Sequence, residues 1–223
     1  MAWALAMLQH KPVHGLATHW RLIFFAIVGA TMGTLLDAVH VWTGTAGYRG
    51  VAMVPVLNVA WYVPPEFAVA GMVVGMLRPE LDEELSRPRS DLPGWQVLAG
   101  MLFLCAVWGS SGLLGRAGLS NTQITAILTP TAAAGWVAFD RTRQGVIAAI
   151  LTAVVGVGVE SALVQTGTYY YTRPDFLGVP SWLPSVYLTA CGAVGNLGRF
   201  LKYSWDRPPG EQDAPEAPRG EAA

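Results

Sequence analysis

Long apolar runs, separated by short polar segments, dominate the pattern of hydrophobic and polar positions along this 223-residue chain. A helix of about 20 apolar residues is long enough to cross the hydrocarbon core of a bilayer. Six runs reach this length, at roughly 22–42, 54–77, 95–114, 120–139, 145–167 and 182–201. The pattern therefore predicts an all-α, polytopic membrane protein with six transmembrane helices.

The composition changes abruptly after the sixth run. Residues 206–223 are rich in Pro, Glu, Gly and Ala, and a segment of this composition cannot bury a core. We therefore expect a six-helix transmembrane domain over residues 1–205 and a disordered cytoplasmic tail over residues 206–223.

Basic residues divide unequally between the two sides of the predicted bundle. With the N-terminus inside, eleven of the fourteen Lys and Arg side chains fall on the inner side, and only Arg49, Arg116 and Arg173 fall outside. Positive charge collects on the cytoplasmic side of membrane proteins, so we expect both termini to be cytoplasmic. Four tryptophans at predicted span ends are typical of an interfacial aromatic belt: Trp20, Trp42, Trp95 and Trp182.

Two pairs of glycines with four-residue spacing lie in the first two runs, Gly29 with Gly33 and Gly71 with Gly75. Pairs of small residues at this spacing let helix backbones approach closely in a membrane. We expect them to pack within the bundle, and a subunit interface is the alternative.

Three acidic residues fall inside the predicted spans, namely Asp37, Glu66 and Glu160. A charged side chain at the bilayer centre costs about 2.5–3.5 kcal/mol on insertion scales. Buried acids therefore need a polar or wet neighbourhood, and the predicted topology places these three between the middle of the membrane and the outer leaflet.

Further polar groups are predicted at the same depth. Pro64 and Pro65 cannot donate backbone hydrogen bonds, so a helix through them would leave nearby carbonyl groups, including that of Trp61, without donors. Gln123 lies near the outer end of the fourth run. These residues and the three acids define a candidate ligand cavity. Two alternatives remain open: hydrogen bonds between helices without any ligand, and a proton or ion pathway that uses the acids.

Evidence for catalysis is weak. The segment GSSG, residues 109–112, resembles the nucleophile motif of rhomboid intramembrane proteases, but a serine nucleophile needs a base within hydrogen-bond reach. Every histidine lies at or before residue 40, whereas rhomboids place theirs on a late helix. The chain has no P-loop, paired cysteine set or dinucleotide fingerprint, and its net charge of −1 gives no sign of nucleic-acid binding. We expect no enzyme, no cofactor other than a bound lipid, and no metal.

Five motifs, in matching order, resemble those of the Insig family. AWYVPP (60–65) is similar to Ala-Trp-Trp-Val-Pro-Pro, and AFDRTRQG (138–145) is similar to Phe-Asp-Arg-Ser-Arg-Ser-Gly. TGTYYYTRPDF (166–176) resembles Asn-Gly-Val-Tyr-Gln-Tyr-Thr-Ser-Pro-Asp-Phe, and SWLP (181–184) and GNLGR (195–199) complete the set. The resemblance implies six membrane-spanning helices with both ends in the cytosol and no enzymatic activity.

The resemblance also implies a ligand and a partner. Insigs bind oxysterols and engage other membrane proteins, so we expect a sterol-like or diacylglycerol-type lipid and a membrane-protein partner, with a homo-oligomer as a further expectation. Gln123 matches the glutamine of the family's sterol pocket. Asp140 matches an aspartate needed for partner engagement, with Arg141 beside it; from the residues alone, Asp140 is expected to cap the fifth helix. Glu66 and Phe67 stand where the family has two cysteines.

The excess of Arg over Lys, with abundant Ala, Gly and Pro, is typical of a GC-rich genome. It favours a bacterial homologue in the plasma membrane, whereas a eukaryotic chain would lie in the endoplasmic reticulum.

Overall fold

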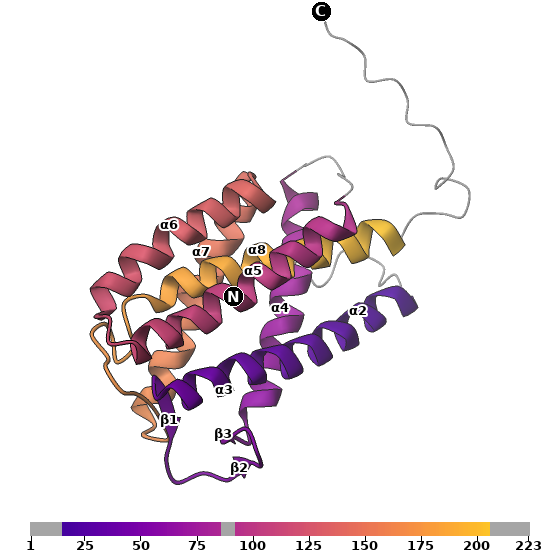
Figure 1. Ribbon diagram of the computed structural model, residues 1–223. Coiled ribbons are helices and arrows are strands. Elements are labelled where there is room, and N and C mark those ends of the chain that lie inside the picture. The colour runs from indigo at the N-terminus through magenta and orange to yellow at the C-terminus, as the bar shows by residue number, and fades with distance from the viewer. Residues whose placement is uncertain (1–14, 86–91, 206–223) are drawn as a thin grey trace, which may run out of the picture.

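Six long helical segments make up most of the part of the chain that the computed structural model describes, residues 15–85 and 92–205 (Figure 1). The first is continuous through α2 (Gly15–Val28), the π-helical turn η1 (Gly29–Gly33) and α3 (Thr34–Thr43). The other five are α4 (Val63–Glu84), α5 (Gly94–Arg116), α6 (Asn121–Phe139), α7 (Arg143–Gln165) and α8 (Leu183–Trp205). The prediction of an all-α bundle is confirmed, and the predicted tail, residues 206–223, lies outside the described residues.

Among the described residues, three helices are able to cross a membrane by length and apolarity alone. They are Thr18–Thr43, Gly94–Arg116 and Arg143–Gln165. The helices α4, α6 and α8 complete the bundle. Of these, α8 lies in contact with α4, α5, α6 and α7, so it forms the centre of the arrangement (Figure 1). Its burial on several sides explains why its sequence carries polar residues that a lipid-facing helix does not tolerate.

Glycines let the helices approach closely, and the prediction that they pack within the bundle is confirmed. A Cβ atom placed on Gly71 would lie 2.4 Å from the backbone carbonyl oxygen of Phe25, and one on Gly29 would lie 2.0 Å from that of Phe67. The backbones of α4 and of the first helical segment are therefore in direct contact where they cross. A third contact joins α4 to α8, because a Cβ on Gly198 would meet the carbonyl oxygen of Gly75 at 1.9 Å.

The start of the second span differs from the prediction. Residues 53–60 form a small antiparallel hairpin, β2 (Met53–Val54) and β3 (Val59–Ala60), and the helix begins only at Val63. Pro64 and Pro65 lie in the first turn of α4, where a missing N–H breaks no helical hydrogen bond. The prediction that these prolines interrupt a helix at mid-membrane is therefore wrong.

A second short sheet joins two outer loops that are distant in the sequence. Strand β1 (Ala46–Tyr48) follows α3, and it pairs antiparallel with β4 (Tyr169–Tyr171), which follows α7. The register sets Tyr48 opposite Tyr169 and Ala46 opposite Tyr171. We call the end of the bundle that carries this sheet the outer end, following the predicted orientation, and the opposite end the inner end.

The loop from Thr172 to Leu183 continues from this sheet to α8. The carboxylate of Asp175 accepts hydrogen bonds from the backbone N–H of Ser181 at 2.7 Å and from its hydroxyl at 3.0 Å, which closes the loop on itself. Trp182 is 1% exposed, so its predicted place in an interfacial belt is wrong. Trp20, Trp42 and Trp95 are 66–70% exposed, as that belt requires.

Candidate functional site

The structure brings together three residues that the sequence analysis assigned to a ligand cavity. Asp37 on α3, Glu66 in the first turn of α4 and Glu160 on α7 border one small cavity at the outer end of the bundle. Asp37 and Glu160 are buried, and Glu66 is half-buried. Each carboxyl group comes from a different helix, so the site exists only in the assembled bundle.

Tyrosine hydroxyls satisfy the two buried carboxyl groups. Glu160 accepts hydrogen bonds from Tyr171 and Tyr187, and from Tyr169 at a longer distance of 3.5 Å. Tyr48 donates to Asp37 Oδ2 at 2.6 Å. Buried polar groups are hydrogen-bonded in folded proteins because an unpaired one is costly. Phenols therefore provide the polar neighbourhood that the acids need, and we call this group of acids and tyrosines the carboxyl–phenol cluster.

Glu66 occupies a different position from the one predicted. Because α4 begins at Val63, Glu66 lies in its first turn, at the outer end of the helix and not at its middle. Its backbone N–H donates to the carbonyl of Tyr62 at 3.0 Å. An acidic side chain in the first turn also interacts favourably with the helix dipole. The run 54–77 places Glu66 near the middle of the predicted second span, and this position is wrong, although its place beside the other two acids agrees with the predicted group of polar residues.

Other predicted residues do not line this cavity. Trp61 is 61% exposed, Pro65 is exposed and Pro64 is half-buried beside the cavity residue Val63. Gln123 is exposed at the start of α6, where its Oε1 atom accepts a hydrogen bond from the backbone N–H of Ser120 at 2.9 Å. Gln123 completes a capping box with Ser120, so local geometry accounts for its position.

The cavity beside the cluster has a volume of about 20 Å³, which suits roughly one water molecule. Val63, Phe67 and Leu163 provide its apolar surface. A lipid head group therefore needs the surrounding side chains to move before it can enter. What the arrangement offers chemically is a set of hydrogen-bond donors and acceptors next to apolar side chains.

A buried serine and histidine also meet, which the sequence analysis did not anticipate. His40 Nε2 lies 2.8 Å from the hydroxyl oxygen of Ser111, in the GSSG segment, and both side chains are at most 2% exposed. The Ser111 hydroxyl donates to the carbonyl oxygen of Trp108 at 2.6 Å. With its proton directed to that carbonyl, the Ser111 oxygen is left to accept a hydrogen bond from the His40 ring. The rings of Trp108 and Trp182 cover His40, and the pair links α3 to α5.

At the inner end, a second buried polar group contains the predicted partner-binding residue Asp140. Its carboxylate accepts hydrogen bonds from Arg78 at 3.1 Å and from the Thr142 hydroxyl at 2.5 Å, and its side chain is 2% exposed. Arg78 also pairs with Asp82, whose other oxygen lies 2.7 Å from Nε of Arg199. We call Arg78, Asp82, Asp140 and Arg199 the inner ion cluster; its two positive and two negative charges balance.

The structure corrects the predicted helix cap. The N-cap of α7 is Thr142, whose hydroxyl accepts a hydrogen bond from the N–H of Gly145 at 3.0 Å. The carboxylate of Asp140 accepts a hydrogen bond from the Thr142 hydroxyl and so keeps Thr142 in its capping position. A Cβ atom on Gly145 would lie 1.8 Å from the carboxylate of Asp140. Arg141 is exposed and has a positive φ of 59°. A partner at this turn can therefore touch Arg141 but not the buried Asp140.

Metal binding finds no support within residues 15–85 and 92–205, where no group of three or more His, Cys, Asp or Glu side chains has the arrangement of a metal site.

Comparisons with known proteins agree with this architecture. A family model described as insulin-induced protein (INSIG) matches residues 116–202. The chain is 31% identical to insulin-induced gene 1 protein of Gallus gallus over 200 residues, which cover 86% of this chain and 79% of that protein. It is 30% identical to the Homo sapiens protein over 181 residues, which cover 81% of this chain and 64% of the human one.

Among solved structures, the fold is similar to that of MvINS, an Insig homologue from Mycobacterium vanbaalenii, with a TM-score of 0.74 and 24% identity. The match covers 85% of this chain and 97% of that structure. A cross-linked trimer of MvINS matches with the same TM-score. With the motifs in order, the helical bundle and relatives of about 30% identity over most of its length, this chain is a membrane protein of the Insig family.

Proposed function

We propose that this protein is a non-enzymatic membrane protein that binds an uncharged amphipathic lipid, sterol-like or of the diacylglycerol type, between its helices. The observation that carries the proposal is the carboxyl–phenol cluster, in which Asp37, Glu66 and Glu160 meet on the outer half of the bundle. A hydroxyl head group is both a donor and an acceptor, so it matches carboxyl oxygens and phenol hydroxyls equally well.

The entry route lies between α4 and α7. The helix α7 packs mainly on α8, and α4 packs on the first helical segment and on α8, whereas α4 and α7 contact each other more sparingly. Glu66 on α4 is half-buried, and Phe67 and Leu163 border the same cavity. A lipid that parts these side chains can place its head group on the cluster while its apolar body stays against apolar helix surfaces. Because the existing cavity holds about one water molecule, binding is coupled to this opening.

Partner binding forms the second part of the proposal. Arg141 is exposed on the turn that the inner ion cluster holds, and so it is the residue of this turn that a cytoplasmic partner can contact. Asp140 acts by positioning the turn. The cross-linked MvINS trimer supports the proposal that one partner is a second copy of this chain, in a homo-oligomer. We place the protein in a bacterial plasma membrane on the basis of its Arg-rich composition.

One observation favours a proton or ion pathway as the second candidate function. The hydroxyl of Tyr62, which borders the cluster, lies 3.4 Å from the Thr168 hydroxyl, and that hydroxyl lies 2.7 Å from the one of Thr166. These groups lead from the buried acids towards the outer loop. Intramembrane acids are often parts of proton relays, and such a relay would use the same residues without a bound lipid.

Purification without added lipid separates the two functions. An organic extract of the protein in mild detergent is analysed by mass spectrometry, and an unrelated six-helix protein from the same membranes is the control for carried-over lipid. The proposal predicts one glyceride or sterol-like lipid per chain, enriched over the control. Extracts that match the control, together with pH-dependent flux in protein-containing liposomes, would reject lipid binding in favour of the pathway.

A further inference from the structure

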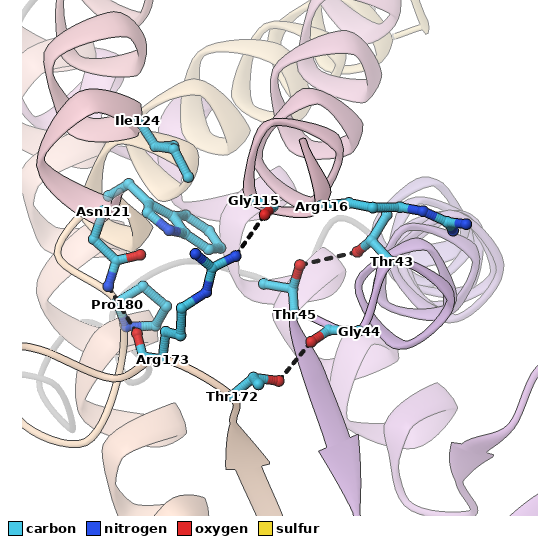
Figure 2. Close-up of a pocket in the computed structure, with 11 residues that line it drawn as sticks. Thr43, Gly44, Thr45, Gly115, Arg116, Asn121, Ile124, Thr172, Arg173 and Pro180 are labelled. Carbon is cyan, nitrogen blue, oxygen red and sulfur yellow. Dashed lines mark hydrogen bonds between the residues drawn. The ribbon is translucent and has the colours of Figure 1, made fainter. Parts of the chain in front are cut away.

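A larger cavity lies at the outer end of the bundle, and it shares no residue with the carboxyl–phenol cluster. Its volume is about 250 Å³, and it lies where the end of α3, the end of α5 and the start of α6 meet the loop before α8 (Figure 2). Its lining combines polar residues, two arginines among them, with glycines and apolar residues: Thr43, Gly44, Thr45, Gly115, Arg116, Asn121, Ile124, Thr172, Arg173, Pro180 and Trp182.

Arg173 directs its guanidinium group into this cavity. One terminal nitrogen donates to the carbonyl oxygen of Gly115 at 2.5 Å (Figure 2). The other lies 3.5 Å from the carbonyl oxygen of Leu119. A guanidinium has five N–H donors, so these contacts leave donors available on the cavity side. Arg116 points away from the centre of the cavity, and its guanidinium lies 4.6 Å from the ring centre of Trp42.

The charge of Arg173 is not balanced by a neighbouring acid within the described parts of the chain. No Asp or Glu is among the residues that line the cavity. Asp175, two residues away, forms no ion pair with Arg173, and its carboxylate instead accepts hydrogen bonds from the backbone N–H and the hydroxyl of Ser181. The first turn of α6, at Asn121, adds the positive end of a helix dipole to the same cavity. The cavity therefore combines a positive potential with free donors.

We propose that this cavity is a binding site for a phosphate group, centred on the guanidinium of Arg173. A guanidinium matches the geometry of phosphate oxygens and binds them in a bidentate way. The hydroxyls of Thr45 and Thr172 also line the cavity, but they are hydrogen-bonded to the Thr43 hydroxyl and to the Gly44 carbonyl, so the guanidinium is the principal donor for a phosphate. In the Insig motif given above, serine stands at the position of Arg173, so the site is a feature of this chain and not of the family motif.

The phosphate group has two sources, namely the head group of an anionic lipid in the outer leaflet or a free phosphate in solution. The exposed Trp42 beside Arg116 marks the depth of the membrane interface. This depth places the cavity at the level of lipid head groups, so we favour the lipid. The site neither requires nor excludes the lipid proposed at the carboxyl–phenol cluster.

Arg173 also stabilises the end of α5, because it binds the carbonyl of Gly115. Two variants separate this structural role from ligand binding. Arg173→Gln retains a donor for the carbonyl and loses the charge. Gly115→Leu retains Arg173 and fills the cavity, since a Cβ on Gly115 meets its neighbours only at 3.7–4.0 Å. The control is Arg49→Gln, which removes an exposed outer arginine that packs on the ring of Tyr170 and does not line the cavity.

The test measures binding to the full chain in neutral detergent. One arm compares retention of phosphatidylglycerol and phosphatidylcholine by native mass spectrometry, and the other measures thermal stabilisation by inorganic phosphate against chloride at matched ionic strength. We expect phosphatidylglycerol to bind preferentially, and Arg173→Gln and Gly115→Leu each to weaken this binding about tenfold, while Arg49→Gln leaves it unchanged.

The outcomes divide clearly. Preference for phosphatidylglycerol without an effect of inorganic phosphate assigns the site to a lipid, and stabilisation by inorganic phosphate assigns it to a free anion; both support a phosphate site. The proposal is overturned if the parent protein responds in neither arm. It is equally overturned if Arg49→Gln weakens binding as much as Arg173→Gln, because the attraction is then a general effect of surface charge, or if both cavity variants bind like the parent.

Discussion

The guanidinium of Arg78 lies 3.1 Å from the carboxylate of Asp140, 62 residues further along the chain. This contact joins the inner part of α4 to the turn between α6 and α7. The ion pair of Asp82 with Arg199 joins α4 to α8 in the same cluster. All four side chains are almost fully buried. Removal of one partner leaves an uncompensated charge away from water, which is more costly than the loss of the attraction itself.

Asp140→Asn is therefore expected to lower the free energy of unfolding by about 3 kcal/mol. Arg141→Gln, in the same turn but exposed, should change it by less than about 0.5 kcal/mol. Denaturant unfolding in mild detergent, followed by tryptophan fluorescence, measures both. If Asp140→Asn is as stable as Arg141→Gln, the inner ion cluster does not stabilise the fold. Asp140 would then again be a candidate for direct contact with a partner.

The crossing of α4 with the first helical segment gives a second prediction. Gly71→Ala places a methyl group against the carbonyl oxygen of Phe25, so the helices must separate, and we expect a loss of about 1–3 kcal/mol. Gly158→Ala in α7, where a Cβ meets nothing within 4 Å, is the matched control and should be neutral or slightly stabilising. Equal thermal stability of the two variants would contradict the close crossing.

Orientation in the membrane can be tested with single cysteines at Arg49 and Arg141, both exposed, in a background without Cys105 and Cys191. The excess of basic residues at the inner end predicts that an impermeant thiol reagent labels position 49 in intact cells and position 141 only after lysis. Labelling of both positions in intact cells would contradict the three spans, α4, α5 and α6, that separate them.

The sequence predicted the helical bundle well but misplaced the start of α4. The segment VPVLNVAWYV (54–63) is apolar apart from Asn58, so its composition fits a membrane helix as well as a short hairpin. The structure turns this segment at Val56 and Asn58, which both have positive φ. The useful signal was the proline pair, since proline is favoured in the first turn of a helix and disfavoured inside one.

The site was predicted only in part for a related reason. The three acids were identifiable because charge in an apolar run is costly. Tyr169 and Tyr171 were missed because they lie in an outer loop, and only the pairing of β4 with β1 places their hydroxyls on Glu160. The pairing of β1 with β4 joins elements more than a hundred residues apart, and hydrophobic periodicity carries no information on such pairing. The run of aromatic and β-branched residues in TYYYT (168–172) is the local signal of a short strand.

Glu66 provides a direct probe of the proposed lipid site, because it lines the cavity beside the carboxyl–phenol cluster, at the proposed entry between α4 and α7. Glu66→Gln retains a hydrogen-bonding side chain of similar size, so fold and bound lipid should be preserved. Glu66→Leu removes the proposed hydrogen bond from this side chain to the lipid, which is worth about 0.5–1.5 kcal/mol. Lipid retention should therefore fall about two- to tenfold while thermal stability is kept. Retention that equals the parent in both variants would show that Glu66 does not contact the lipid.

Mapping a bound lipid is the most direct measurement on the central claim, that an uncharged lipid binds at the carboxyl–phenol cluster. A photoactivatable diacylglycerol with its reactive group near the glycerol is cross-linked to the purified protein, and the labelled peptides are identified with and without excess unlabelled diacylglycerol. We expect competed labelling in the first turn of α4, around Glu66 and Phe67, and on α7 around Glu160 and Leu163. Labelling that is confined to the exposed face of α7, at Val154 and Val155, or that excess lipid does not displace, would contradict the claim.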